Sequence, residues 1–328
     1  LCTIVDNKVK KLLNLKKHSD FIFENDDTLL FSYAKNKQEE KQEKEKVSLF
    51  YRYHLKEGRL EKAFNIPMPV QVVKVIGKKI ILKAQLTPDE HQLYTLNEED
   101  RKAFLKAQKK LKAYEDITEI PFYSNGNGFV TQKRSQLFIY DIDTKTFDLI
   151  VDPDFNVSIV KVSKDLKHIY YTGKQAKHVR TLTSHVFVYH LESKQTEVLY
   201  QKDDFSISNV FLIKDKILVE ASDMQKFGLN EDGHFYELKH KELVLFKTFG
   251  LTISSSVGSD SRLGGNPATL IYKDKLYFVK TSDDHTELMT LDLDKNIEQV
   301  AETELDDLNS NSLQNHYRKM TREFKKGN

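Results

Sequence analysis

Short apolar strands alternate with polar turns along the chain, and one strand pattern returns at a nearly fixed interval. Its copies centre on equivalent positions, which are Ile4 in a weak first copy and then Tyr53, Tyr140, Tyr189, Leu238 and Leu291. The steps between these positions are 49, 87, 49, 49 and 53 residues. A fixed period in this range is typical of a repeat architecture. The 87-residue step equals one 49-residue repeat plus 38 residues, so it predicts an insertion.

A predicted hairpin precedes each full copy of this strand, as where two β-branched and aromatic runs flank the turn at 163–165. A polar turn and one more apolar run follow the strand, so each unit holds four antiparallel strands. Four strands in about 49 residues is the size of a propeller blade. We therefore predict an all-β fold, a β-propeller with about five complete units and a partial one over residues 1–301. A two-sheet sandwich also has many short strands, but it does not explain units in one register.

The residues added in the long step predict a helical insertion at about 97–118. Asn97 is a suitable N-cap, and three acidic residues follow it. Apolar residues then recur at helical spacing, at Phe104, Ala107, Leu111 and Tyr114. Two interpretations remain, a helix packed on the rim of a blade and a helix that contacts another domain.

Three other segments lack the strand pattern. The charged run at 35–46 has mixed signs, and we expect a solvated loop there. Residues 302–328 are polar, and we expect a tail that is helical or disordered. The first residues enter a repeat halfway through, so we expect the chain to be a fragment or an isolated domain.

Composition narrows the classes of partner and compartment. Lysine and arginine number 51 against 49 acidic residues, so charge gives no reason to expect nucleic acid or an anionic membrane as a partner. Cys2 is the only cysteine, and the first residues lack the apolar core of a signal peptide. No stretch approaches the roughly 18 to 20 apolar residues of a spanning helix. These features predict a cytoplasmic protein without disulfides.

The sequence contains no complete catalytic constellation. The text nearest to a G-x-S-x-G nucleophile elbow, at 258–262, lacks the closing glycine. His185 and His190 differ in strand parity and cannot readily share a metal ion. The glycine-rich run at 125–128 precedes a strand, which favours a tight turn over a phosphate cradle. We predict no catalytic residue, no cofactor site and no metal site in this chain.

Two segments nevertheless resemble a known family. The first reads EIPFYSNGNGF at 119–129 and continues as KRSQLFIYD at 133–141, and the second reads SSSVGSDSRLGG at 254–265. Both are similar to the propeller of bacterial acylaminoacyl-peptidase-like enzymes, which belong to the prolyl oligopeptidase family of serine peptidases. The resemblance spans roughly residues 10–301, and its two motifs fall in the right order on a matching repeat.

The resemblance implies a two-part enzyme. A propeller, usually of seven blades, covers an α/β-hydrolase domain that carries the catalytic Ser, Asp and His, and it admits only short or unfolded peptides. This chain lacks the hydrolase domain, so we expect it to be inactive alone. Its expected partners are the α/β-hydrolase domain of the same polypeptide and short peptide substrates. The expected enzyme is of the acylaminoacyl- or dipeptidyl-peptidase type. The alternative is a stand-alone propeller that binds a protein or peptide without catalysis.

Four residues are candidates for substrate gating or for the domain interface, namely Asp260, Arg262, Arg134 and Asn125. Asp260 and Arg262 would share a face in a strand or pair locally in a loop. Arg262 could bind a substrate carboxylate with two hydrogen bonds, and the alternative is a structural ion pair that holds a loop over the channel. Arg134 lies just before a predicted strand, where we expect a surface or inter-blade role.

Overall fold

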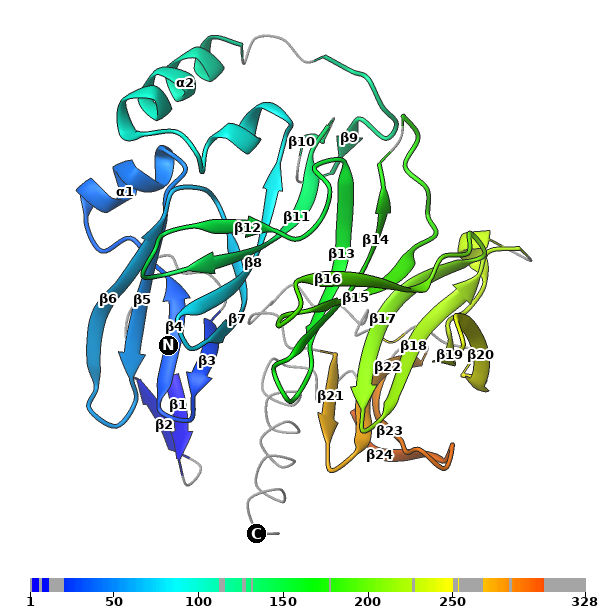
Figure 1. Ribbon diagram of the computed structural model, residues 1–328. Helices are drawn as coiled ribbons and strands as arrows, with labels where there is room; N and C mark the ends of the chain where they lie inside the picture. Colours follow the sequence, from blue (N-terminus) through cyan, green and yellow to red (C-terminus); the bar gives the residue numbers. More distant parts are fainter. Residues whose placement is uncertain are drawn as a thin grey trace. The chain divides into compact units, whose positions relative to one another are not determined.

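The computed structural model describes residues 2–5, 8–11, 21–111, 116–125, 128–130, 132–176, 178–225, 228–249, 253, 268–282 and 285–303. These residues form five four-stranded antiparallel sheets, each a blade of a propeller (Figure 1). The chain divides into two compact units, which are Leu1–Leu166 with Gly173–Thr181 and Lys167–Thr172 with Leu182–Asn328. The predicted all-β propeller fold is therefore confirmed.

Four strands in sequence order build each blade, except that the insertion separates the second and third strands of blade 2. Blades 1 and 2 contain β3 (Phe21–Asn25), β4 (Thr28–Ser32), β5 (Ser48–His54), β6 (Arg59–Ile66), β7 (Gln71–Ile76), β8 (Lys79–Leu86), β11 (Arg134–Asp141) and β12 (Phe147–Leu149). Blade 3 contains β13 (Phe155–Val162), β14 (His168–Gln175), β15 (His185–His190) and β16 (Gln195–Tyr200).

The remaining strands complete two further blades and two short hairpins. Blades 4 and 5 contain β17 (Phe205–Ile213), β18 (Lys216–Asp223), β19 (His234–Lys239), β20 (Glu242–Lys247), β21 (Thr269–Tyr272), β22 (Lys275–Ser282), β23 (His285–Leu291) and β24 (Ile297–Thr303). The hairpins are β1 (Cys2–Val5) with β2 (Lys8–Lys11), and β9 (Tyr123–Ser124) with β10 (Gly128–Phe129). Short 3-10 turns, η1 (Asp89–Gln92) and η2 (Gly228–Asn230), lie in connections. Residues 304–328, most of the predicted tail, lie outside the described residues.

The predicted repeat corresponds to the third strand of every blade. The equivalent positions fall on β5, β11, β15, β19 and β23, as Tyr53, Tyr140, Tyr189, Leu238 and Leu291. The weak first copy around Ile4 falls on β1, which pairs with β2. The periodicity was informative because the third strand is a central strand of its sheet, with hydrogen-bonded neighbours on both sides.

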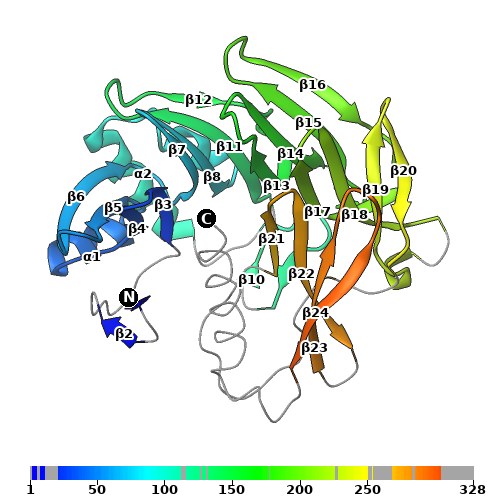
Figure 2. The same cartoon turned by 90° about the horizontal axis from the view of Figure 1, so that it is seen from below.

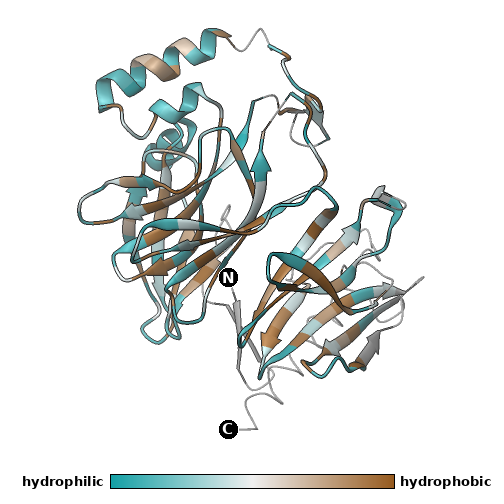
Figure 3. Ribbon diagram, turned by 45° about the vertical axis from the view of Figure 1, so that its right-hand side comes forward, coloured by the Kyte–Doolittle hydropathy of each residue, from teal (hydrophilic) through white to brown (hydrophobic). Residues whose placement is uncertain are grey.

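Apolar side chains from neighbouring blades form the cores of both units. In the first unit, Phe50 and Phe64 of blade 1 pack in one buried cluster with Leu82 and Phe138 of blade 2. The register pairs Phe138 with Leu82, so both side chains lie on the same face of the sheet. A similar cluster in the second unit joins blades 4 and 5. Figure 3 shows hydrophobic residues concentrated on the strands, whereas the helices are mostly hydrophilic. Burying each such side chain stabilises the fold by roughly 1.5–3 kcal/mol.

The charged run at 35–46 is not the predicted loop, because it contains the two-turn helix α1 (Lys37–Lys44). Asn36 is the N-cap, and its side-chain oxygen accepts a hydrogen bond from the backbone N–H of Glu39 at 3.0 Å. Acidic residues occupy the first turn and lysines the last turn, which suits the helix dipole.

Glu39 explains why this helix is held against blade 1. Its carboxylate is nearly buried and accepts hydrogen bonds from the Tyr51 hydroxyl and the Lys62 ammonium at 2.9 Å. The backbone N–H of Lys35 donates to it at 2.8 Å. The charge pattern of residues 35–46 does not show that Glu39 is buried while the neighbouring charged residues are exposed to solvent.

The insertion in blade 2 contains the expected helix, α2 (Glu98–Leu111), but its packed face differs from the predicted stripe. Ala107 is exposed, the Leu111 side chain is 57% exposed, and Tyr114 lies outside the described residues. The residue buried on this helix is Arg101.

Arg101 positions α2 through polar contacts rather than through an apolar stripe. Its guanidinium donates to the carbonyl oxygens of Glu45 at 2.7 Å and Lys46 at 2.9 Å, just beyond the end of α1. Both carbonyls belong to the residues that directly follow the last helical residue, Lys44. The helix of the insertion is thereby joined to blade 1 of the same unit.

Candidate functional site

One residue from each part of the first family-like motif contributes to a buried ion pair. Arg134 is the first residue of β11, and its guanidinium donates to both carboxylate oxygens of Glu119, each at 2.9 Å. The side chains are 10% and 3% exposed. Such a bidentate arrangement is the strong, geometrically specific form of a charged hydrogen bond. The pair therefore ties Glu119 of the insertion to the first residue of β11.

A second arginine completes the site. Arg180 lies in the connection after β14, and its guanidinium is 3.6 Å from Glu119 Oε1. The same group donates to the Val130 carbonyl at 2.6 Å. The backbone N–H of Gln132 also donates to the Glu119 carboxylate. One carboxylate is thus contacted by three residues from two parts of the chain, Gln132 and Arg134 around the start of β11 and Arg180 after β14.

The protonation of Glu119 depends on two opposed effects. Burial favours the neutral carboxyl group and raises its pKa. Hydrogen bonds from Arg134 and Gln132, with the positive charges of Arg134 and Arg180, outweigh this effect and bring the pKa of Glu119 below its ordinary value of 4.5. The carboxylate is therefore ionised at neutral pH.

Backbone bonds tie the same segment to residues 178–180. The N–H of Ile120 donates to the His178 carbonyl at 2.8 Å, and the N–H of Arg180 donates to the Ile120 carbonyl at 2.9 Å. Ile120 and Val179 form an isolated parallel bridge. In the hairpin β9–β10, Gly128 has a positive φ of 71°, which agrees with the predicted tight turn.

Exposed apolar side chains lie on the described part of this segment and on the neighbouring residue Val179. Those with 39% to 62% exposure are Ile117, Ile120, Phe122, Tyr123, Phe129 and Val179. Two of them contact each other, since the Tyr123 and Phe129 rings are 5.6 Å apart in an edge-to-face arrangement. We call these six residues the apolar surface. Exposed apolar groups gathered on an ordered segment typically mark an interaction site.

The structure places two of the four predicted site residues. Arg134 is 9% exposed, so the expected surface role does not apply, and its main partner belongs to the insertion. Asn125 is exposed in the turn between β9 and β10, and no hydrogen bond between described residues joins it to Arg134. Asp260 and Arg262 lie outside the described residues.

Sequence reasoning missed Glu119 and Arg180 as members of the site. Glu119 stood within the quoted motif, 15 residues before Arg134. No strand or helix periodicity spans that gap, so only the pairing of two opposite charges in one motif could have indicated it. Arg180 lies outside the motif and gave no signal.

Within the described residues, no three His, Cys, Asp or Glu side chains are grouped to hold a metal ion. In the same residues, neither helix has the length and apolarity required to cross a bilayer.

Comparisons with known proteins agree with this architecture. No family model and no curated protein matches the sequence. Among solved structures, the chain is similar to the acylaminoacyl peptidase of Pyrococcus horikoshii, with a TM-score of 0.56 and 11% identity over 90% of this chain and 40% of that one. It is also similar to an acylaminoacyl peptidase in complex with Z-Gly-Gly-Phe-chloromethyl ketone, with a TM-score of 0.51 and 12% identity over 84% and 37%.

A third solved structure, from a study of two prolyl endopeptidases, has a TM-score of 0.51 and 11% identity over 90% and 38%. The chain therefore has the fold of the β-propeller domains of these peptidases. It spans about 40% or less of the length of each matched structure.

Proposed function

We propose that this chain is the non-catalytic, substrate-gating propeller of a cytoplasmic serine peptidase that cleaves short peptides. Three observations support the proposal. The sequence resembles the propeller of acylaminoacyl-peptidase-like enzymes in two ordered motifs. The fold agrees with the resemblance. The first motif folds into one site, in which Glu119 and Arg134 bind each other.

The observation that carries the proposal is this ion pair in the segment that bears most of the apolar surface. Burying two charges costs free energy, and the close bidentate pairing of Arg134 Nη1 and Nη2 with Glu119 offsets part of this cost, while the buried Arg134 Nε has no hydrogen-bond partner among the described residues. The pairing orders the segment that carries the exposed apolar side chains before any partner binds. Less conformational entropy is then lost when a partner binds. The apolar surface accordingly has the character expected of an interface.

The occupant that we propose for the apolar surface is an α/β-hydrolase domain of the same polypeptide. The matched peptidase structures are more than twice as long as the part that this chain covers. A propeller docked on such a domain leaves a restricted route to the catalytic serine. The chemistry then belongs to the hydrolase domain, and the propeller supplies steric selection.

The test compares the purified chain with the complete polypeptide that its gene encodes. Both are treated with a fluorophosphonate probe for activated serines and assayed with acetylated and free aminoacyl chromogenic peptides. We expect the complete polypeptide to be labelled and active, because it carries the nucleophile, the base and the oxyanion hole. The chain alone is expected to be inactive.

The same test separates the alternative function. A stand-alone propeller that binds peptides predicts a gene product without a G-x-S-x-G segment and without labelling. Labelled serine in the complete polypeptide together with unrestricted cleavage of folded proteins would contradict gating while leaving the peptidase assignment in place.

A further inference from the structure

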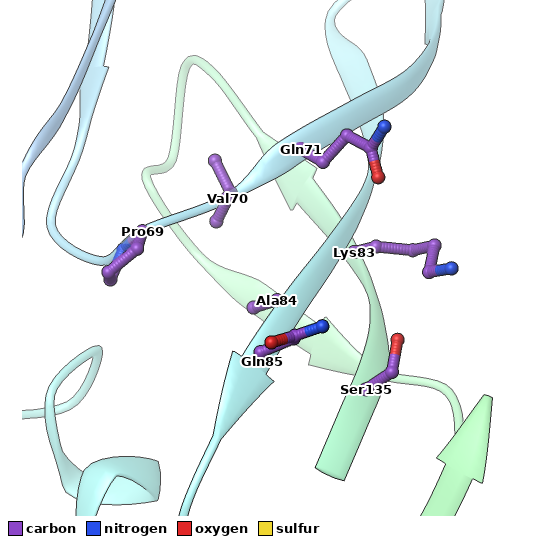
Figure 4. Close-up of a pocket in the computed structure, with 7 residues that line it drawn as sticks. All are labelled: Pro69, Val70, Gln71, Lys83, Ala84, Gln85 and Ser135. Atoms are coloured by element: carbon purple, nitrogen blue, oxygen red, sulfur yellow. The ribbon is translucent and has the colours of Figure 1, made fainter. Parts of the chain in front are cut away.

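A polar pocket lies on blade 2 of the first unit, lined by residues of β7, β8 and β11 and by the two residues before β7. Strand register places its four polar side chains on one face, because Gln71 pairs with Lys83 and Gln85 pairs with Ser135. Lys83 and Gln85 are two apart on β8 and so project on the same side. Figure 4 shows the Gln71 and Lys83 side chains extending in one direction, with the Ser135 hydroxyl pointing toward the Lys83 side chain.

These side chains, with Pro69 and Val70, line a cavity of about 310 Å³. That volume is at the lower end of the range of small-molecule sites, which suits the last residues of a peptide. Within the described residues, the side chains of Gln71, Gln85 and Ser135 form no hydrogen bond to the protein. Their amide and hydroxyl groups are therefore available to a ligand as donors.

Lys83 gives the pocket its charge. Its ammonium group donates to the carbonyl oxygen of Ser158 on β13 at 2.7 Å. Among the described residues it has no ion pair with a carboxylate, and burial lowers the pKa of its ammonium group. A partly buried cation is stabilised when an anion is bound beside it. The pocket thus combines one unbalanced positive charge with three neutral polar groups.

We propose that this pocket binds a carboxylate, with Lys83 as the cation and Ser135, Gln71 and Gln85 as hydrogen-bond donors. The identification of the carboxylate with the C-terminus of a peptide rests on the proposed gating function. The pocket adjoins the Glu119–Arg134 site along the same pair of strands, since Arg134 precedes Ser135 on β11. The site would retain peptides with a free C-terminus.

The experiment measures fluorescence anisotropy of an N-terminally fluorescein-labelled tetra-alanine with the purified 328-residue chain. The peptide is supplied as the free acid and as the C-terminal amide. We expect the free-acid peptide to bind at least tenfold more tightly than the amide, because it gains a charged hydrogen bond to Lys83. A third peptide is an amide with one internal aspartate, and its binding would show that the pocket also accepts a side-chain carboxylate. Inorganic phosphate is added as a competitor, and competition would show that the pocket is a general anion site.

Lys83→Gln is expected to abolish the preference for the acid, and Lys83→Arg to retain it. Lys161→Gln is the matched control, because Lys161, on β13 of blade 3, is a partly buried lysine like Lys83 but does not line the cavity. Gln85→Ala is a second test. Gln85 is exposed, so we expect this variant to fold, and it should weaken binding of the free-acid peptide but not of the amide. Far-UV circular dichroism confirms that each variant is folded.

Equal affinity for acid and amide, or no binding of either, overturns the proposal. So does a Lys83→Gln variant that keeps the preference, or a Lys161→Gln variant that loses it equally. Phosphate competition with unchanged affinity for the amide supports an anion site but overturns peptide selectivity. Because binding is measured on the chain alone, these results are independent of whether the gene encodes a hydrolase domain.

Discussion

Glu119 and Arg134 form a bidentate ion pair with both N···O distances at 2.9 Å, although 15 residues separate them in the chain. Both side chains are almost completely shielded from solvent. The pair closes the insertion of blade 2 onto β11, and β8 and β11 lie side by side in Figures 1 and 2. The pair holds Glu119 in place, and the next residue, Ile120, belongs to the apolar surface on which the proposed function depends.

Removal of one partner should destabilise the protein strongly. Glu119→Gln or Arg134→Met leaves an uncompensated charged or polar group in a buried site, and we expect a loss of about 3–5 kcal/mol in the free energy of unfolding. The double variant Glu119→Gln with Arg134→Met should lose less than the sum of the two single variants, because neither charge remains. Urea unfolding followed by far-UV circular dichroism measures these values.

The control is Arg59→Gln, since the Arg59 side chain is 51% exposed and its ion pairs with Glu57 and Glu61 lie in solvent. That variant should be nearly neutral. Additive losses in the Glu119 and Arg134 cycle would show that the two groups do not stabilise each other.

The Glu119 carboxylate also predicts a pH dependence. Its pKa in the folded state lies below the ordinary value of 4.5, so its contribution to stability is present above that pH and is lost as the pH falls through the folded-state pKa. Glu119→Gln should therefore have a shallower loss of stability below pH 4.5 than the wild type. Thermal midpoints measured from pH 3 to pH 7 compare the two slopes. Parallel curves would exclude Glu119 as the titrating group.

Glu220 predicts the opposite dependence. This buried glutamate of β18 accepts hydrogen bonds from Asn209 Nδ2 at 2.6 Å and from the Ile253 N–H at 3.0 Å. Burial outweighs these bonds and raises its pKa above 4.5. Its contribution is thus present below pH 4.5 and is lost as the pH rises through the folded-state pKa. Glu220→Gln should gain stability relative to the wild type between pH 5 and pH 8, and a constant difference would contradict this assignment.

Arg101 should be essential for the position of α2. Arg101→Ala removes the donor from two partly buried hydrogen bonds to carbonyl oxygens, and we expect a loss of about 1–3 kcal/mol in the free energy of unfolding. Lys102→Ala is the neighbouring control, because its side chain is 62% exposed and its ion pair with Glu98 lies in solvent. Hydrogen exchange of the α2 amides should accelerate in the first variant only. Equal exchange in both would show that other contacts hold the helix.

The sequence predicts most of the fold because the third strand of each blade returns at a nearly fixed interval along the chain. Four of the five equivalent positions, Tyr53, Tyr140, Tyr189 and Leu291, are buried on these central strands, and Leu238 is partly buried. The helices were less predictable. Glu39 and Arg101 anchor α1 and α2 through buried polar contacts with distant residues, and such contacts have no period.

The candidate site was predictable only in part, for the same reason. Arg134 was proposed from its motif, but its role depends on Glu119 and Arg180, which the fold brings to it. The pocket at Lys83 was not found, because its polar face appears only when the register of β7, β8 and β11 is known.

The central claim is that segment 116–134 docks on a hydrolase domain of the same polypeptide. Hydrogen exchange measured by mass spectrometry on this chain and on the complete gene product tests it most directly. The account predicts slower exchange of the amides at 117–130 in the complete protein. The control is β20, where Val244 and Leu245 are each 51% exposed and exchange should be unchanged. Equal exchange at 117–130 in both proteins would contradict the claim.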